Sequence, residues 1–214
     1  MRKVFGILLA LLSPELFLWA NPIAAPAPNP GDLNKADTYR ILCLREVTIV
    51  PTIPVDHSWA RQLEEILNEG DPRTPFVVLN HLPGAGTEIL ESTLPLYLDR
   101  FDPDLVIGMM SGVAPARLRR IIDAVRARGA PVMLLQYPWL EARSLREGLS
   151  LSTGVTIVDN AESFDKALAN GKQEDYLHAP SSGGFRHFTA KGDRLIAENA
   201  ADAGLLVAVS DAAG

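Results

Sequence analysis

Apolar and polar residues follow two distinct patterns along most of this chain, one typical of strands and one typical of helices. From residue 39 onward, short apolar runs are separated by longer segments in which apolar residues recur every three or four positions. Short runs that are apolar on both faces indicate buried parallel strands, and the three-to-four spacing indicates helices with one buried face. We therefore expect strands at residues 39–44, 76–79, 104–110, 132–136 and 155–158. Helices are expected at residues 57–69, 88–101, 115–128, about 140–149, 161–169 and 189–205.

The alternation of strands and helices predicts the fold class. Strands that are apolar on both faces, with helices between them, form a parallel sheet that is covered on both sides. Right-handed crossover connections then give a flavodoxin-like, three-layer α/β sandwich. In such sheets functional groups gather at the carboxyl ends of the strands. The stretches expected at this edge are 44–50, 80–86, 110–115 and the loop before the last helix.

The beginning of the chain does not share this pattern and resembles an export signal followed by a linker. Two basic residues precede an apolar stretch over residues 4–19, which is interrupted by Ser-Pro-Glu at residues 13–15. We expect residues 1–20 to form a signal peptide or, as an alternative, an N-terminal membrane anchor. Residues 21–38 are expected to form a Pro/Ala-rich linker and residues 39–214 a single domain. In both cases the domain would lie outside the cytoplasm, as a secreted, periplasmic or outward-facing anchored protein.

Composition narrows the possible functions. The chain has 214 residues, of which 47% are apolar and 21% charged, with a net charge of -6 at pH 7. These values are ordinary for a soluble domain, and nucleic acid is not an expected partner. The single cysteine, Cys43, lies in an apolar run, so we expect it to be a buried core residue. One cysteine excludes an internal disulfide and a cysteine-rich zinc site. No cofactor is expected, because the Gly84-Ala85-Gly86 stretch lacks the rest of a dinucleotide-binding fingerprint.

Several blocks of the sequence, in the right order, resemble those of the SGNH (GDSL) hydrolases. YRILCLREVTIV at 39–50 and HSWARQLEEIL at 57–67 are similar to the opening block of that family. FVVLNHLPG at 76–84 and FDPDLVIGMMSGVAP at 101–115 are similar to the second and third blocks. GFRHFTAKG at 184–192 resembles the block that carries the catalytic Asp and His. The resemblance covers nearly everything after residue 38 and implies the SGNH hydrolase fold, in an exported subgroup.

The same resemblance implies that most catalytic positions are substituted. The family's nucleophilic serine falls on Val47 and its triad aspartate on Gly184. Its oxyanion-hole glycine falls on His81, and its oxyanion-hole asparagine on Val113, or on the next residue if the register slips by one. Only His187 stands where the family has its catalytic base. Valine has no acidic proton and no lone pair, so no acyl intermediate can form at position 47. We therefore expect an esterase/lipase-family domain with impaired catalysis, which binds a small acyl, glycan or lipid ligand in the inherited cleft.

An active esterase remains an alternative interpretation. Thr48 or Ser111 could serve as an unconventional nucleophile, or Glu46, His81 and His187 could hold zinc with an open coordination position. No sequence motif supports the metal site, and no base is placed at a known distance from either hydroxyl. We therefore expect the chain to bind no metal.

The hydroxyls of one serine and one threonine are expected to cap helices. Ser58 lies near the start of the first helix and Thr189 near the start of the last, where such side chains cap helices.

A third interpretation makes the whole domain an envelope scaffold or interaction module, in which the inherited cleft has no role.

Overall fold

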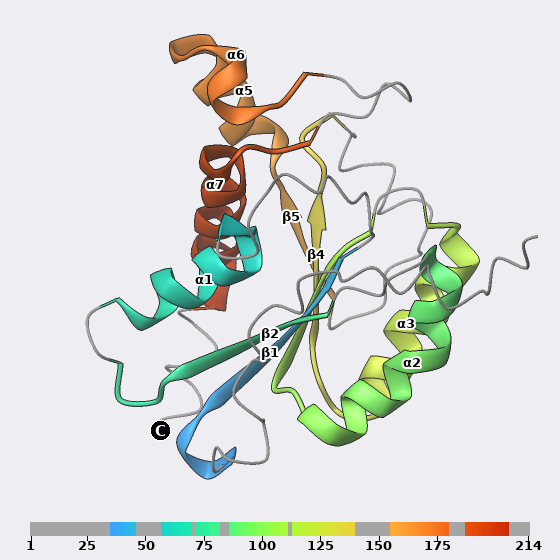
Figure 1. Ribbon diagram of the computed structural model, residues 1–214. Helices are drawn as coiled ribbons and strands as arrows, with labels where there is room; N and C mark the ends of the chain where they lie inside the picture. Colours follow the sequence, from blue (N-terminus) through green and yellow to red (C-terminus); the bar gives the residue numbers. More distant parts are fainter. Residues whose placement is uncertain are drawn as a thin grey trace, which may run out of the picture.

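The computed structural model describes residues 35–45, 57–69, 72–81, 86–110, 113–139, 155–179 and 187–205. Its centre is a five-stranded sheet with the strand order β2-β1-β3-β4-β5, in which every paired strand is parallel (Figure 1). The strands are β1 (Tyr39–Arg45), β2 (Phe76–His81), β3 (Leu105–Met109), β4 (Val132–Gln136) and β5 (Val155–Asp159). The predicted parallel α/β sandwich is confirmed, and each strand lies within two residues of its expected bounds.

Helices cover both faces of the sheet (Figure 1). They are α1 (Trp59–Asn68), α2 (Gly86–Phe101), α3 (Pro115–Arg126), α5 (Ala161–Asn170), α6 (Gln173–Tyr176) and α7 (Ala190–Ala200). A 3-10 turn, Lys35–Asp37, precedes β1, and a π-helical turn, Ala201–Leu205, follows α7. Side chains of α1, α5 and α7 build the core on one face, and side chains of α2 and α3 build it on the other.

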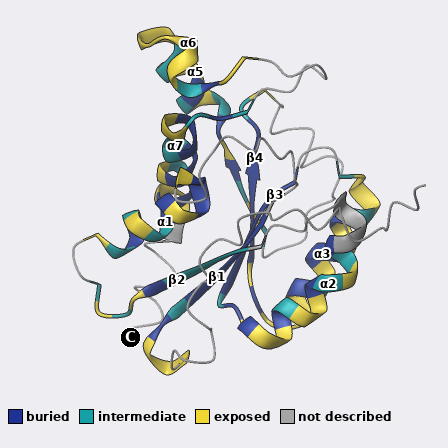
Figure 2. Cartoon of the chain, in the orientation of Figure 1, coloured by how far each residue is buried: buried dark blue, intermediate teal, exposed yellow. Residues whose placement is uncertain are grey.

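The strand β1 shows why the apolar runs predicted buried strands. Ile41 and Cys43 belong to the core on the α1/α7 face, whereas Leu42 and Leu44 belong to the core on the α2/α3 face. All four side chains are 0% exposed, as the dark interior of Figure 2 illustrates. Burial raises the pKa of the Cys43 thiol well above its ordinary value, with a further contribution from the charge of Glu64. The expectation that Cys43 is a core residue is confirmed.

The structure corrects three details of the expected elements. The segment around Asp175, between the helices expected at 161–169 and 189–205, contains the short helix α6, which was not expected. Only Val158 of β5 is buried, and β5 is an edge strand that pairs with β4 on one side alone in the described sheet. The last helix starts one residue later than expected, since Thr189 caps it, and it changes to a π-helical turn at Ala201.

Two expected segments lie outside the described residues. They are the helix at about 140–149 and the export segment with most of the linker, so both stay predictions. Among the helices that the structure describes, none combines the length and the apolar character needed to cross a bilayer.

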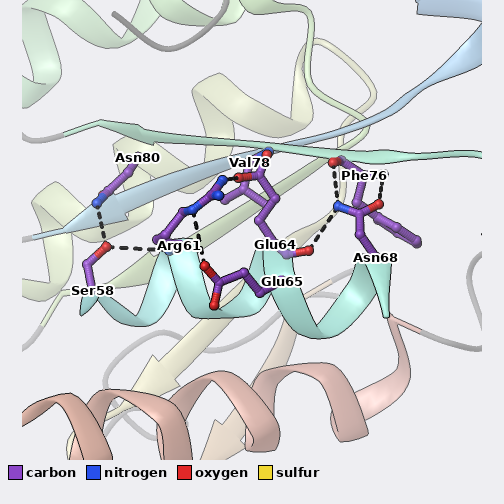
Figure 3. Close-up of polar contacts among 8 residues, drawn as sticks. All are labelled: Ser58, Arg61, Glu64, Glu65, Asn68, Phe76, Val78 and Asn80. Carbon is purple, nitrogen blue, oxygen red and sulfur yellow. Dashed lines mark hydrogen bonds and ion pairs between the residues drawn. The ribbon is translucent and has the colours of Figure 1, made fainter. Parts of the chain in front are cut away.

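The outer edge of β2 is covered by polar side chains of α1 (Figure 3). Asn68 donates its amide to the carbonyl of Phe76 at 3.0 Å and accepts from the Phe76 N–H at 2.9 Å. One turn earlier, Glu64 accepts from the N–H of Val78 at 3.2 Å and pairs with Arg61. These contacts satisfy backbone groups that an edge strand would otherwise offer to another strand.

Candidate functional site

Three neighbouring strands end side by side where the sequence predicts the site. The last residue of β1, Arg45, is opposite Met109 at the end of β3, and Leu44 is opposite His81 at the end of β2. The SGNH-like positions 47, 81 and 113 follow or form these strand ends in the sequence. Val47 and Gly184 lie outside the described residues, and of His81 the structure describes the backbone but not the side chain. The assignments at these three positions therefore remain predictions.

Val113 is a described member of the predicted oxyanion hole. It lies between β3 and α3, is half-buried, and packs against the apolar core on the α2/α3 face. The next residue, Ala114, is the N-cap of α3 and provides no side-chain hydrogen bond, while Pro115 occupies the first turn. An isopropyl group offers no hydrogen-bond donor, so the Val113 side chain contributes packing alone, and its assignment to the oxyanion hole remains a prediction.

Ser58 has the capping role that the sequence predicted. Its hydroxyl oxygen accepts from the backbone N–H of Arg61 and from the side-chain amide of Asn80, each at 3.4 Å (Figure 3). The residue is only 4% exposed. Neither of these two partners is a histidine or a carboxylate. The chemistry needed to convert Ser58 into a nucleophile is therefore missing from its described surroundings.

The segment that carries His187 is fixed by backbone contacts to the end of α6. The backbone carbonyl of His187 accepts from the backbone N–H of His178 at 2.8 Å, and Phe188 forms an antiparallel bridge with Leu177. The N–H of Thr189 donates to the carbonyl of Tyr176 at 3.0 Å. His187 itself is half-buried. These backbone contacts hold the segment of residues 187–189 against the end of α6. His187, where the resemblance places the catalytic base, thus directly precedes the buried side chain of Phe188.

The N-terminus of α7 approaches the same carbonyl closely. Thr189 caps the helix by accepting from the N–H of Gly192 at 3.2 Å, which confirms its expected capping role. A β-carbon on Gly192 would lie 2.2 Å from the Tyr176 oxygen. Glycine is therefore required here, because any side chain would push α7 away from the end of α6.

Aromatic residues that sequence reasoning missed connect this segment to β4. Tyr137 directly follows β4, and its ring lies 5.7 Å from that of Phe188. The ring of Trp139 lies 5.2 Å from Tyr137 and 5.6 Å from Phe188, nearly parallel to the latter at 24°. Phe164 of α5 extends the cluster inward, 5.4 Å from Phe188. The available signal was the Tyr-Pro-Trp sequence directly after a predicted strand, at the edge where functional groups gather.

The zinc hypothesis is not tested by these residues. Among the described residues, no three His, Cys, Asp or Glu side chains are grouped closely enough to hold a metal ion. Glu46 and the side chain of His81, two of the three suggested ligands, lie outside that description.

Comparison with known proteins supports the fold. No family model and no curated protein matches the sequence. Two solved structures match with a TM-score of 0.55 each: a family 3 carbohydrate esterase from Clostridium thermocellum and a protein named TesA. The esterase is 14% identical, and the match covers 79% of this chain and 96% of the esterase. TesA is 20% identical, with 78% and 98% covered. The chain therefore has the SGNH hydrolase fold that its sequence blocks imply.

Proposed function

We propose that this chain is an SGNH-fold domain that has lost serine-type ester hydrolysis and binds a ligand at the carboxyl edge of its sheet. The observation that carries the proposal is the packing of Val113 against the core, at the position where the hydrolase family has an oxyanion donor. Loss of one such donor typically raises the barrier by about 2.7–4 kcal/mol. The absence of any side-chain oxygen at Val47 adds to this, because the nucleophile itself is missing.

The proposal of ligand binding is supported by the side chains that the structure describes at the carboxyl edge of the sheet. His187 is half-buried beside Phe188, and Trp139 stacks on Phe188 with 44% of its surface still exposed. One of the two similar structures is named as a carbohydrate esterase, which favours the glycan among the expected acyl, glycan and lipid ligands. Aromatic side chains at the carboxyl edge of the sheet can bind a ligand even where the nucleophile needed to cleave an ester is absent.

Hydrolysis of p-nitrophenyl acetate by the purified full chain tests the loss of catalysis. We expect no turnover above the buffer rate. The combined variant Val47→Ser, Val113→Asn, Gly184→Asp restores the family's residues at three positions and should become labelled by a fluorophosphonate, which traps activated serines. Ser58→Ala on that background is the matched control and should leave labelling unchanged, because Ser58 caps α1.

Turnover by the unmodified chain would overturn the proposal. If Thr48→Ala or Ser111→Ala removed that turnover, an unconventional nucleophile would be identified. If a chelator removed it, the metal hypothesis would be supported instead.

A further inference from the structure

We propose that Trp139 is the stacking platform of a subsite for a neutral carbohydrate. This inference rests on the proposed function and names the class of ligand. Trp139 lies two residues beyond Tyr137, which itself follows the end of β4. It therefore lies at the edge of the sheet where ligands bind in this class of fold.

The burial of the three rings differs in a way that a core cluster does not explain. Tyr137 is 8% and Phe188 2% exposed, whereas Trp139 keeps 44% of its surface exposed. The only other large apolar side chain exposed among the described residues is Leu96, on α2. Two buried rings thus support one side of the indole while the rest faces solvent. Because the contacts with Tyr137 and Phe188 already restrict the indole, little further side-chain entropy is lost when a ligand stacks on it.

The chemistry around the indole favours a sugar over an acyl chain. A pyranose presents a face of C–H groups that packs on a flat aromatic ring, while its hydroxyl groups point outward to polar partners or water. The segments that hold the platform carry such partners: His187 precedes Phe188, and the exposed His178 is bonded to the backbone of His187. An acyl chain would need a continuous lining of aliphatic side chains, and the residues flanking Phe188 are histidine and threonine. The net charge of -6 favours a neutral glycan over an acidic one.

Calorimetric titration of the purified full chain tests the subsite. The probes are cellotetraose, xylotetraose and N,N′,N″,N‴-tetraacetylchitotetraose, with decanoate below its micellar concentration as the acyl probe. We expect at least one tetrasaccharide to bind and Trp139→Ala to weaken that binding by about tenfold or more, the effect of a lost aromatic stack with its buried area. Leu96→Ala, the matched control, should leave the affinity unchanged. Trp139→Phe should retain part of the affinity, and urea unfolding of each variant shows whether it is folded.

The outcomes separate this inference from the proposed function. Binding of none of the three sugars, binding that Trp139→Ala leaves unchanged, or binding of decanoate alone would overturn the carbohydrate subsite and leave the proposed loss of hydrolysis standing. Sugar binding that depends on Trp139, together with ester turnover by the unmodified chain, would confirm the subsite and overturn the proposed function.

Discussion

Asn68 and Phe76 form two hydrogen bonds that join the last residue of α1 to the free edge of β2. The Asn68 amide donates to the Phe76 carbonyl at 3.0 Å, and its oxygen accepts from the Phe76 N–H at 2.9 Å. The side-chain amide of Asn68 thereby pairs with the backbone of β2 as the peptide group of a neighbouring strand would. Both partners belong to elements that also reach the site, since Ser58 caps the start of α1 and β2 ends at His81.

Replacing Asn68 by alanine should uncover this edge. We expect a loss of about 1–3 kcal/mol in the free energy of unfolding, because two backbone groups lose their partner. The uncovered strand should also promote self-association. Urea unfolding and sedimentation velocity measure the two effects.

Asn170→Ala is the matched control for Asn68→Ala. Asn68 donates to the carbonyl of Glu64, four residues earlier in α1, and the exposed Asn170 donates in the same way to the carbonyl of Lys166 within α5. Equal effects of the two substitutions on stability and association would show that the contact with Phe76 has no special role.

Substitution of Val113 by asparagine should destabilise the domain. The isopropyl group packs against the core on the α2/α3 face, and an amide there would lose apolar contact and be partly desolvated. We expect a cost of about 1–3 kcal/mol, measured by urea unfolding. Val113→Ile, which keeps the apolar character, should have a smaller effect. An unchanged stability in Val113→Asn would contradict the packing role assigned to the isopropyl group.

Gly192→Ala should displace the start of α7. Its β-carbon would meet the Tyr176 oxygen at 2.2 Å, a distance that only a backbone shift can relieve. We expect a loss of about 1–3 kcal/mol, the usual range for overpacking, together with a change in the near-ultraviolet circular dichroism of the nearby aromatic rings. Lys191→Ala, at the exposed neighbouring position, should change stability by no more than about 1 kcal/mol, because it removes an exposed contact of the ammonium with the Tyr176 ring. A Gly192→Ala protein as stable as the parent would contradict the close approach.

The buried thiol of Cys43 should make stability fall at alkaline pH. Burial raises the pKa of Cys43 in the folded protein, so the unfolded chain loses the thiol proton first as pH rises. The free energy of unfolding should therefore be highest below about pH 8.5, the ordinary thiol pKa, and decline above it by up to about 1.4 kcal/mol per pH unit.

Urea unfolding between pH 7 and pH 10 checks this slope against Cys43→Ala. The variant lacks the thiol and should show a shallower decline, while the raised pKa of Tyr39 contributes to both proteins alike. Parallel pH profiles for the two proteins would show that Cys43 does not contribute.

The sequence by itself determined the layered fold. Runs such as residues 132–136, which match β4, are apolar at every position or nearly so, and only a strand covered by helices on both faces accommodates this. The helix starts at Ser58 and Thr189 were also determined locally, because a hydroxyl before a helix satisfies its first N–H groups. The proposed loss of a nucleophile likewise rests on one residue type, since the side chain at Val47, where the resemblance places the family's serine, contains no oxygen.

What only the tertiary structure decided are the contacts between residues distant in the sequence. Trp139 and Phe188 are separated by 49 positions, and no local pattern indicates that their rings stack. The packing of the half-buried Val113 against the core on the α2/α3 face, and the contacts of Asn68 with the edge of β2, depend in the same way on how separate elements meet. Periodicity specifies which face of an element is apolar, but it does not specify which side chain of another element that face will touch.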